Sequence, residues 1–177
     1  IIILIILILN LIAPFIVPYD PNFIDINSIL LPPSLAHLMG TDGLGRDVFS
    51  RMLYGAQISL LVGFVAVGIA TIIGVILGSL AGFYRGWVDS LIMRFVDIML
   101  SIPTFFQILA VIAFLTPSIW NIMIVIGLTS WMGVTRLVRA EFLSLRRREY
   151  ILASETMGAS DFNIITKHLL PNSITPI

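Results

Sequence analysis

Few residues in this chain have the types and spacing that catalysis or metal binding requires. His37 and His168 stand apart from other potential ligands, and the chain has no cysteine, so neither histidine is expected to hold a metal ion. The sequence shows no glycine-rich phosphate-binding loop and no nucleophile paired with a general base. We therefore predict no catalytic residue, no cofactor and no metal, and a function that depends on contacts with other molecules.

The segment from Tyr150 to Pro171 has residues suited to such contacts. Apolar residues recur at i, i+3 and i+7 from Tyr150 and again from Phe162, which predicts two short helices. Gly158 lies between them, where a helix end favours a residue with positive φ. Ser160 can cap the second helix, and Pro171 is expected to end it. We interpret the segment as a helix–turn–helix whose turn binds a soluble partner; an interfacial loop without a partner is the alternative.

The composition indicates that membrane-spanning helices hold this segment. The chain has 177 residues, of which 58% are hydrophobic and only 11% charged, whereas soluble domains have about 25% charged residues. No charged residue occurs between Arg51 and Arg85, or between Asp97 and Arg136. Each gap exceeds the roughly 20 apolar residues that cross a bilayer, so we predict an all-α integral membrane protein rather than a soluble core.

Prolines and glycines divide the chain into four expected parts. These are a remnant of a first transmembrane helix (1–13), an extracytoplasmic loop ending in a short interfacial helix (14–57, helix 46–57), transmembrane helices two to four (58–135, with spans near 58–84, 95–115 and 119–135) and a cytoplasmic segment (136–177). The orientation follows from the placement of Lys and Arg. The loop contains two of them, and the opposite side contains eight: Arg85, Arg94, Arg136, Arg139, Arg146, Arg147, Arg148 and Lys167.

One feature of the expected second span bears on helix packing. Small residues recur every four positions in the second span, at Ala66, Ala70, Gly74, Gly78 and Gly82. Such a stripe favours close packing against a helix of the same or a partner subunit, although Gly and Ala are also common in membrane helices.

The third span has polar residues of its own. Arg94 and Asp97 are three residues apart near the cytoplasmic edge, where an ion pair can form at modest cost. We interpret them as anchoring the helix at the membrane surface, with a role in transport as the alternative. Pro103 and Gln107 lie deeper in the same span. They could line a solute pathway, or Gln107 could simply satisfy a carbonyl that the proline leaves free; both interpretations stay open.

The helix–turn–helix resembles the EAA loop of ABC-importer permeases, with a proline thirteen residues after its glycine. By position, the two alanines of that pattern correspond to Ala153 and Ser154, its glycine to Gly158 and its terminal Leu-Pro to Leu170-Pro171. Leu152 stands where the pattern has Glu, and Glu155 offers a carboxylate one turn later. The resemblance implies a coupling helix that docks on a cytoplasmic ATPase through Ala153, Ser154, Glu155, Met157, Gly158, Ala159, Ser160, Asp161 and Pro171.

A second likeness narrows the family. Residues 38–60, which include Gly40-Thr-Asp-Gly-Leu-Gly-Arg-Asp47, resemble the segment before the second span of dipeptide and oligopeptide permeases, as do Gly86-Trp-Val-Asp89, Ser101-Ile-Pro103 and Arg136-Leu-Val-Arg139. The resemblance implies a type I ABC importer permease fold in a bacterial or archaeal inner membrane. This chain would be a fragment with about four of six transmembrane helices, lacking the last two.

The same resemblance implies partners and a cargo. The expected partners are cytoplasmic ABC ATPase subunits, a second homologous permease, an extracytoplasmic solute-binding protein and the lipid bilayer, with no nucleic acid. The cargo would be a peptide or a related small solute such as a nickel chelate. The main alternative is an ion-coupled secondary transporter or channel without an ATPase, which the uncharged second and fourth spans argue against. A membrane-bound enzyme or scaffold is a third class, for which no catalytic residues are seen.

Overall fold

The computed structural model describes residue 12 and residues 17–173 of the chain. The described part contains helices and no β-strand beyond an isolated bridge between Thr41 and Asp47. In order the elements are the 3-10 helix η1 (Ile26–Ser28), α2 (Val48–Tyr84), α3 (Gly86–Ser101), α4 (Thr104–Ile112), α5 (Ile119–Leu145), α6 (Glu149–Thr156), α7 (Asp161–Asn163), the π-helix η2 (Ile164–Leu169) and α8 (Leu170–Ser173). The predicted remnant of a first transmembrane helix, 1–13, falls outside the described residues except for Ile12.

The chain divides after Gly63 into two compact units, which are described separately. In the first unit, carboxylates organise the loop before α2. Asp42 accepts hydrogen bonds from the backbone N–H groups of Leu44 (2.9 Å) and Arg46 (3.0 Å), and pairs with the Arg46 guanidinium. The hydrogen bond from the Arg46 side chain is the main reason why the pKa of Asp42 falls to about 2. The loop is therefore a folded element.

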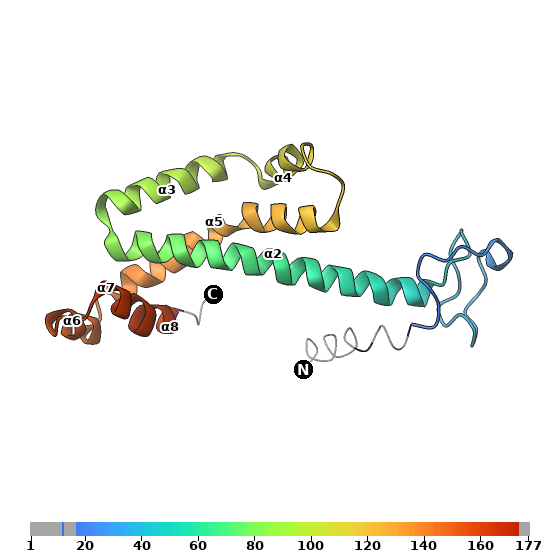
Figure 1. Ribbon diagram of the computed structural model, residues 1–177, viewed down its shortest axis with the longest axis horizontal. Helices are drawn as coiled ribbons and strands as arrows, with labels where there is room; N and C mark the ends of the chain where they lie inside the picture. The colour runs from blue at the N-terminus through green and yellow to red at the C-terminus, as the bar shows by residue number, and fades with distance from the viewer. Residues whose placement is uncertain (1–11, 13–16, 174–177) are drawn as a thin grey trace. The chain divides into compact units, whose positions relative to one another are not determined.

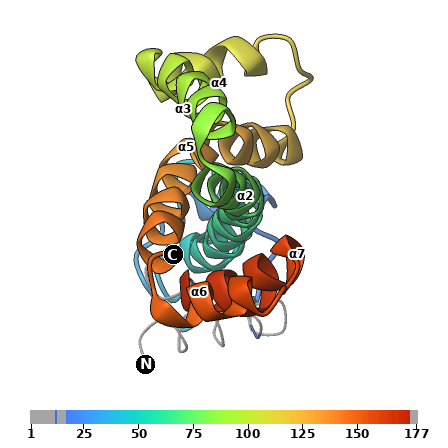
Figure 2. The same ribbon diagram turned by 90° about the vertical axis from the view of Figure 1, so that its left-hand side faces the viewer.

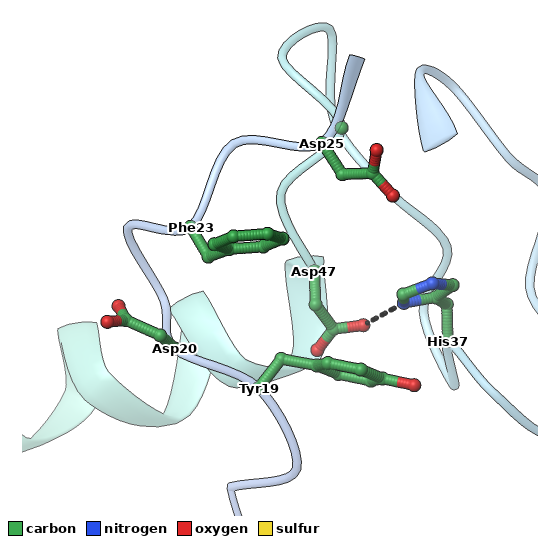
Figure 3. Close-up of a pocket in the computed structure, with 7 residues that line it drawn as sticks. Tyr19, Asp20, Phe23, Asp25, His37 and Asp47 are labelled. Carbon is green, nitrogen blue, oxygen red and sulfur yellow. Dashed lines mark hydrogen bonds and ion pairs between the residues drawn. The ribbon is translucent and has the colours of Figure 1, made fainter. Parts of the chain in front are cut away.

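A small cavity of about 90 Å³ lies in this loop, lined in part by Tyr19, Phe23 and Asp47 (Figure 3). The Tyr19 ring stacks on His37 with 4.8 Å between centroids, and the His37 Nδ1 lies 3.0 Å from the Asp47 carboxylate. Asp47 also accepts a hydrogen bond from the Ser50 N–H at 2.7 Å, as an N-cap residue does. Burial alone would raise the pKa of Asp47. The hydrogen bonds from Ser50 and His37 lower this pKa by more than burial raises it, so the pKa falls below its usual value.

Helix α2 runs unbroken through 37 residues, from Val48 to Tyr84. The sequence predicts a separate short helix over 46–57, and this prediction is wrong in one respect, because residues 48–57 form the first turns of α2. No proline interrupts this stretch, and Gly55 alone does not break a helix that Asp47 caps. At 1.5 Å per residue the helix is about 55 Å long, which exceeds the roughly 30 Å hydrocarbon core of a bilayer.

In the second unit, α5 packs closely along α2, as Figures 1 and 2 show. A Cβ added at Gly74 would meet the Val134 side chain at 2.5 Å, and one at Gly78 would meet the Thr135 carbonyl oxygen at 2.7 Å. Ala66 and Ala70 are buried on the same stripe. The small residues of α2 thus let the two helix backbones approach each other within one chain.

The predicted third span is bent in the structure. Helices α3 and α4 meet at an angle of 83° across the break at Ile102 and Pro103. Proline has no N–H to continue the ladder of α3. The Gln107 amide compensates by donating to the carbonyl oxygens of Ile102 (2.8 Å) and Met99 (2.5 Å). By length and composition α2 and α5 can each cross a membrane, and α3 with α4 makes a third crossing if the bent pair counts as one.

Ion pairs join α3 to α5. Asp89 pairs with Arg139 through two hydrogen bonds of 2.5 and 2.6 Å, and Asp97 pairs with Arg136. The ion pair that the sequence allows between Arg94 and Asp97 is not the one that forms, since the Asp97 carboxylate binds an arginine on the neighbouring helix. The bidentate contact between Asp89 and Arg139 fixes the relative orientation of the two side chains as well as their distance. It therefore holds α3 in one register against α5.

Candidate functional site

The helix–turn–helix predicted near the end of the chain is formed by α6, a turn, and the continuous run of α7, η2 and α8; we call residues 149–173 the hairpin. At the turn, Gly158 has φ of +80°, the left-handed conformation that the sequence predicts there. The backbone N–H groups of Met157 and Ala159 donate to the carbonyls of Ala153 (3.0 Å) and Ser154 (3.1 Å). These bonds satisfy the last carbonyls of α6 in the manner of a glycine C-cap.

The second half of the hairpin departs from the sequence prediction at both ends. Ser160 stands at the N-cap position, but its hydroxyl makes no capping hydrogen bond. Pro171 does not end the helix, because α8 continues to Ser173. The six residues before α8 form a π-helix, and Leu170 N–H bonds to the Ile165 carbonyl five residues back. This wider turn gives the proline ring room that an α-helical turn would deny it.

A buried apolar cluster anchors the hairpin to the spans. Its fully or almost fully buried members are Phe83 on α2, Val138 and Phe142 on α5, and Ile151, Ile164 and Leu169 on the hairpin. Each of the three hairpin side chains contributes roughly 1.5–3 kcal/mol by its removal from water. The cluster also meets the small-residue stripe, because a Cβ at Gly82 would lie 2.5 Å from the Phe142 Cβ. Both helices that pack through the stripe therefore contact the hairpin core.

Two large apolar side chains are exposed beside the turn of the hairpin. Met157 is 80% exposed and Phe162 is 73% exposed, one on each side of Gly158. The side chains that recur from Tyr150 to Met157 are exposed, whereas Ile151 and Ser154 between them are buried. Large apolar side chains exposed together on both sides of one turn favour a binding surface.

Arg146 connects α6 to the end of α2. Its guanidinium donates to the Phe83 carbonyl oxygen, lies 4.5 Å from the Phe83 ring centroid and pairs with the Glu155 carboxylate at 3.3 Å. Glu155 is thus occupied by a contact within the chain. Sequence reasoning did not single out Arg146 or Phe83. The only signal was the run of three arginines, 146–148, directly after an apolar helix.

Of the remaining predicted site residues, Ser160 and Asp161 lie exposed beside the turn, and Ala159 packs against the apolar cluster. Pro103 and Gln107 form a separate site at the α3–α4 break, whose hydrogen bonds do not reach the hairpin. Gln107 is buried, and its Oε1 has no partner among the described residues. Within that part of the chain no group of His, Cys, Asp or Glu could hold a metal ion.

Comparison with known proteins identifies a family and several relatives that this chain resembles. The family described as binding-protein-dependent transport system inner membrane component matches residues 74–177. A probable D,D-dipeptide transport system permease protein of Escherichia coli is 44% identical over all of this chain and 59% of its own length. A dipeptide transport system permease protein of Bacillus subtilis is 40% identical over 99% of this chain and 55% of its own length.

A third relative is a glutathione transport system permease protein of Pectobacterium atrosepticum, which is 39% identical over 93% of this chain and 55% of its own length. The chain thus spans just over half the length of these relatives. The family match begins inside α2 and covers every span and the hairpin that follow it. This chain belongs to the family of binding-protein-dependent transport system inner membrane components.

Proposed function

We propose that this chain is the membrane-embedded permease part of an ABC importer, and that its hairpin docks on a separate cytoplasmic ATPase. The observation that carries the proposal is the two-sided hairpin. One face buries Ile151, Ile164 and Leu169 against the spans, while Met157 and Phe162 project from the turn. A partner that moves the turn would therefore move a body that is packed on both α2 and α5.

The proposal includes partners and a cargo. The family description names a binding-protein-dependent system, which supports an extracytoplasmic solute-binding protein as a partner. A second, homologous permease is the further partner that we propose. The relatives are named for dipeptide, D,D-dipeptide and glutathione transport. These names support a peptide or a related small solute as cargo. Gln107, whose Oε1 has no partner among the described residues, is a candidate pathway residue at the α3–α4 break.

Site-directed crosslinking tests the docking. The 177 residues contain no cysteine, so Met157→Cys introduces a unique thiol into this part of the protein. In the complex assembled with its ATPase, we expect Met157→Cys and Ala159→Cys to crosslink to that subunit. The matched control is Leu35→Cys, which is 99% exposed in the first unit and is expected not to react with the ATPase. The assignment fails if neither hairpin cysteine crosslinks while Trp87→Cys does.

An ion-coupled transporter without an ATPase is the competing function. Such proteins use titratable side chains inside the membrane. Here both acidic residues of α3, Asp89 and Asp97, are paired with arginines of α5, and α2 carries no charge after Arg51. We therefore expect uptake to stop when ATP is depleted. Uptake that survives ATP depletion and collapses with the proton gradient would favour the competing function.

A further inference from the structure

A basic hollow lies between the end of α2 and the start of the hairpin. It has a volume of about 530 Å³ and is lined by Tyr84, Arg85, Arg146, Arg147, Leu152 and Glu155. Three guanidinium groups thus face one carboxylate. Because Glu155 pairs with Arg146, the excess positive charge belongs to the other two arginines. No acidic side chain of the described residues pairs with Arg85 or Arg147.

The position of the hollow matches the surface of a membrane. Arg85 follows the last residue of α2, after an uncharged run that begins at Met52. Trp87, in the first turn of α3, is 77% exposed. Aromatic residues with one polar edge are enriched at the headgroup level of a bilayer, and arginines there contact phosphates.

An apolar track leads along α2 into the hollow. Ile72, Ile76, Leu80 and Tyr84 recur every four residues, and all four side chains are exposed. They lie on one side of the helix. Gly82, which faces Phe142 of α5, is two residues from Tyr84, a rotation of about 200°. The track is therefore on the side of α2 that α5 leaves uncovered.

We infer that this hollow binds the phosphodiester headgroup of an anionic membrane phospholipid, with an acyl chain along the track. Guanidinium groups bind phosphate oxygens through paired N–H donors, and among the described residues neither Arg85 nor Arg147 uses a side-chain donor in an ion pair. The charge excess selects an anionic over a zwitterionic headgroup. The apolar track distinguishes a lipid from free phosphate or from a carboxylate on a partner protein. This inference goes beyond the transport function and does not depend on the identity of the cargo.

Lipid retention in the complete, assembled transporter tests the inference. The complex is purified from nanodiscs that contain phosphatidylglycerol and phosphatidylcholine, and retained lipids are counted by native mass spectrometry. We expect phosphatidylglycerol to be retained preferentially. Its apparent affinity should fall about fivefold for Arg85→Gln or Arg147→Gln and about 25-fold for both. Arg94→Gln removes an exposed arginine of α3 outside the hollow and is the matched control, with no expected loss.

Further measurements separate the lipid from other anions. Ile76→Ser should weaken phosphatidylglycerol binding without a change of charge, and millimolar inorganic phosphate should not displace the lipid. The inference is overturned if Arg94→Gln lowers lipid retention as much as Arg85→Gln does. It is also overturned if millimolar inorganic phosphate displaces phosphatidylglycerol from the complex. It is also overturned if Arg85→Gln and Arg147→Gln release the ATPase while phosphatidylglycerol retention stays unchanged. Retention is measured without transport, so failure of the proposed function would not affect this outcome.

Discussion

At the scale of single residues, Arg146 is the link between the hairpin and the spans. It contacts the carbonyl and ring of Phe83 on α2 and the carboxylate of Glu155 on α6. The sequence has Leu152 where the EAA pattern has a glutamate, which drew attention to Glu155 as a substitute for docking. The structure gives that carboxylate an internal partner, so Glu155 positions α6 within the chain.

A double-mutant cycle on this pair measures the link. Arg146→Gln and Glu155→Gln should each destabilise the protein, with Arg146→Gln the larger effect because it also removes the Phe83 contacts. The coupling energy should be about 0.5–1 kcal/mol, since both side chains are partly exposed to water. Unfolding in mixed micelles with increasing denaturing detergent gives the free energies. A coupling energy of zero would show that the two side chains act independently.

At the scale of elements, sequence patterns predicted the helices well where one physical signal dominated. The uncharged runs predicted helices over the regions of α2 and α5, and the unusual backbone of Gly158 followed from its place between two periodic segments. Other features depend on contacts that no local pattern contains. The Asp97 carboxylate pairs with Arg136 of another helix and not with Arg94 of its own helix. At the 83° bend, Gln107 donates to a carbonyl on the other side of the break.

The hairpin shows the same limit. Its apolar periodicity from Tyr150 predicted a helix correctly, but not which face would be buried. Ile151 is buried because α6 turns that side toward Phe83 and Phe142. The sequence alone could not show which face of α6 is buried, because Phe83 is more than 60 positions away from Ile151 along the chain and lies on another helix. The π-helix before Pro171 also had no local signal.

The α2–α5 contact gives a prediction for a pair of glycines on one helix. A Cβ at Gly78 would lie 2.7 Å from the Thr135 carbonyl oxygen, whereas nothing lies within 4 Å of a Cβ at Gly68. Gly78→Ala should therefore force the helices apart and cost about 1–3 kcal/mol of stability. Gly68→Ala should be neutral or stabilise the helix by up to about 1 kcal/mol.

The same detergent unfolding measurement compares the two variants. Because both substitutions add one methyl group to α2, a difference between them reports packing against α5 and not helix propensity. Equal stability of the two variants would show that the small-residue stripe does not determine how closely α5 approaches.

At the scale of the whole molecule, the central claim is that a soluble ATPase acts on the spans through the exposed turn of the hairpin. The second unit of the chain contains α2 from Phe64 onward, the other spans, the apolar cluster and the turn. Force applied at Met157 or Phe162 would reach Phe83 and Phe142 through the hairpin side chains that pack against them. Family membership fixes the class of protein, and this arrangement proposes how the class works in this chain.

The most direct test replaces the two exposed apolar side chains with charged ones. We expect Met157→Asp/Phe162→Asp to fold and insert normally, because both side chains are exposed, at 80% and 73%. The variant should lose most of the ATPase subunit on purification of the complex and lose ATP-driven uptake, while Leu35→Asp, a change at a 99% exposed residue of the first unit, should retain both. A double variant that keeps a full complement of ATPase and normal uptake would contradict the account.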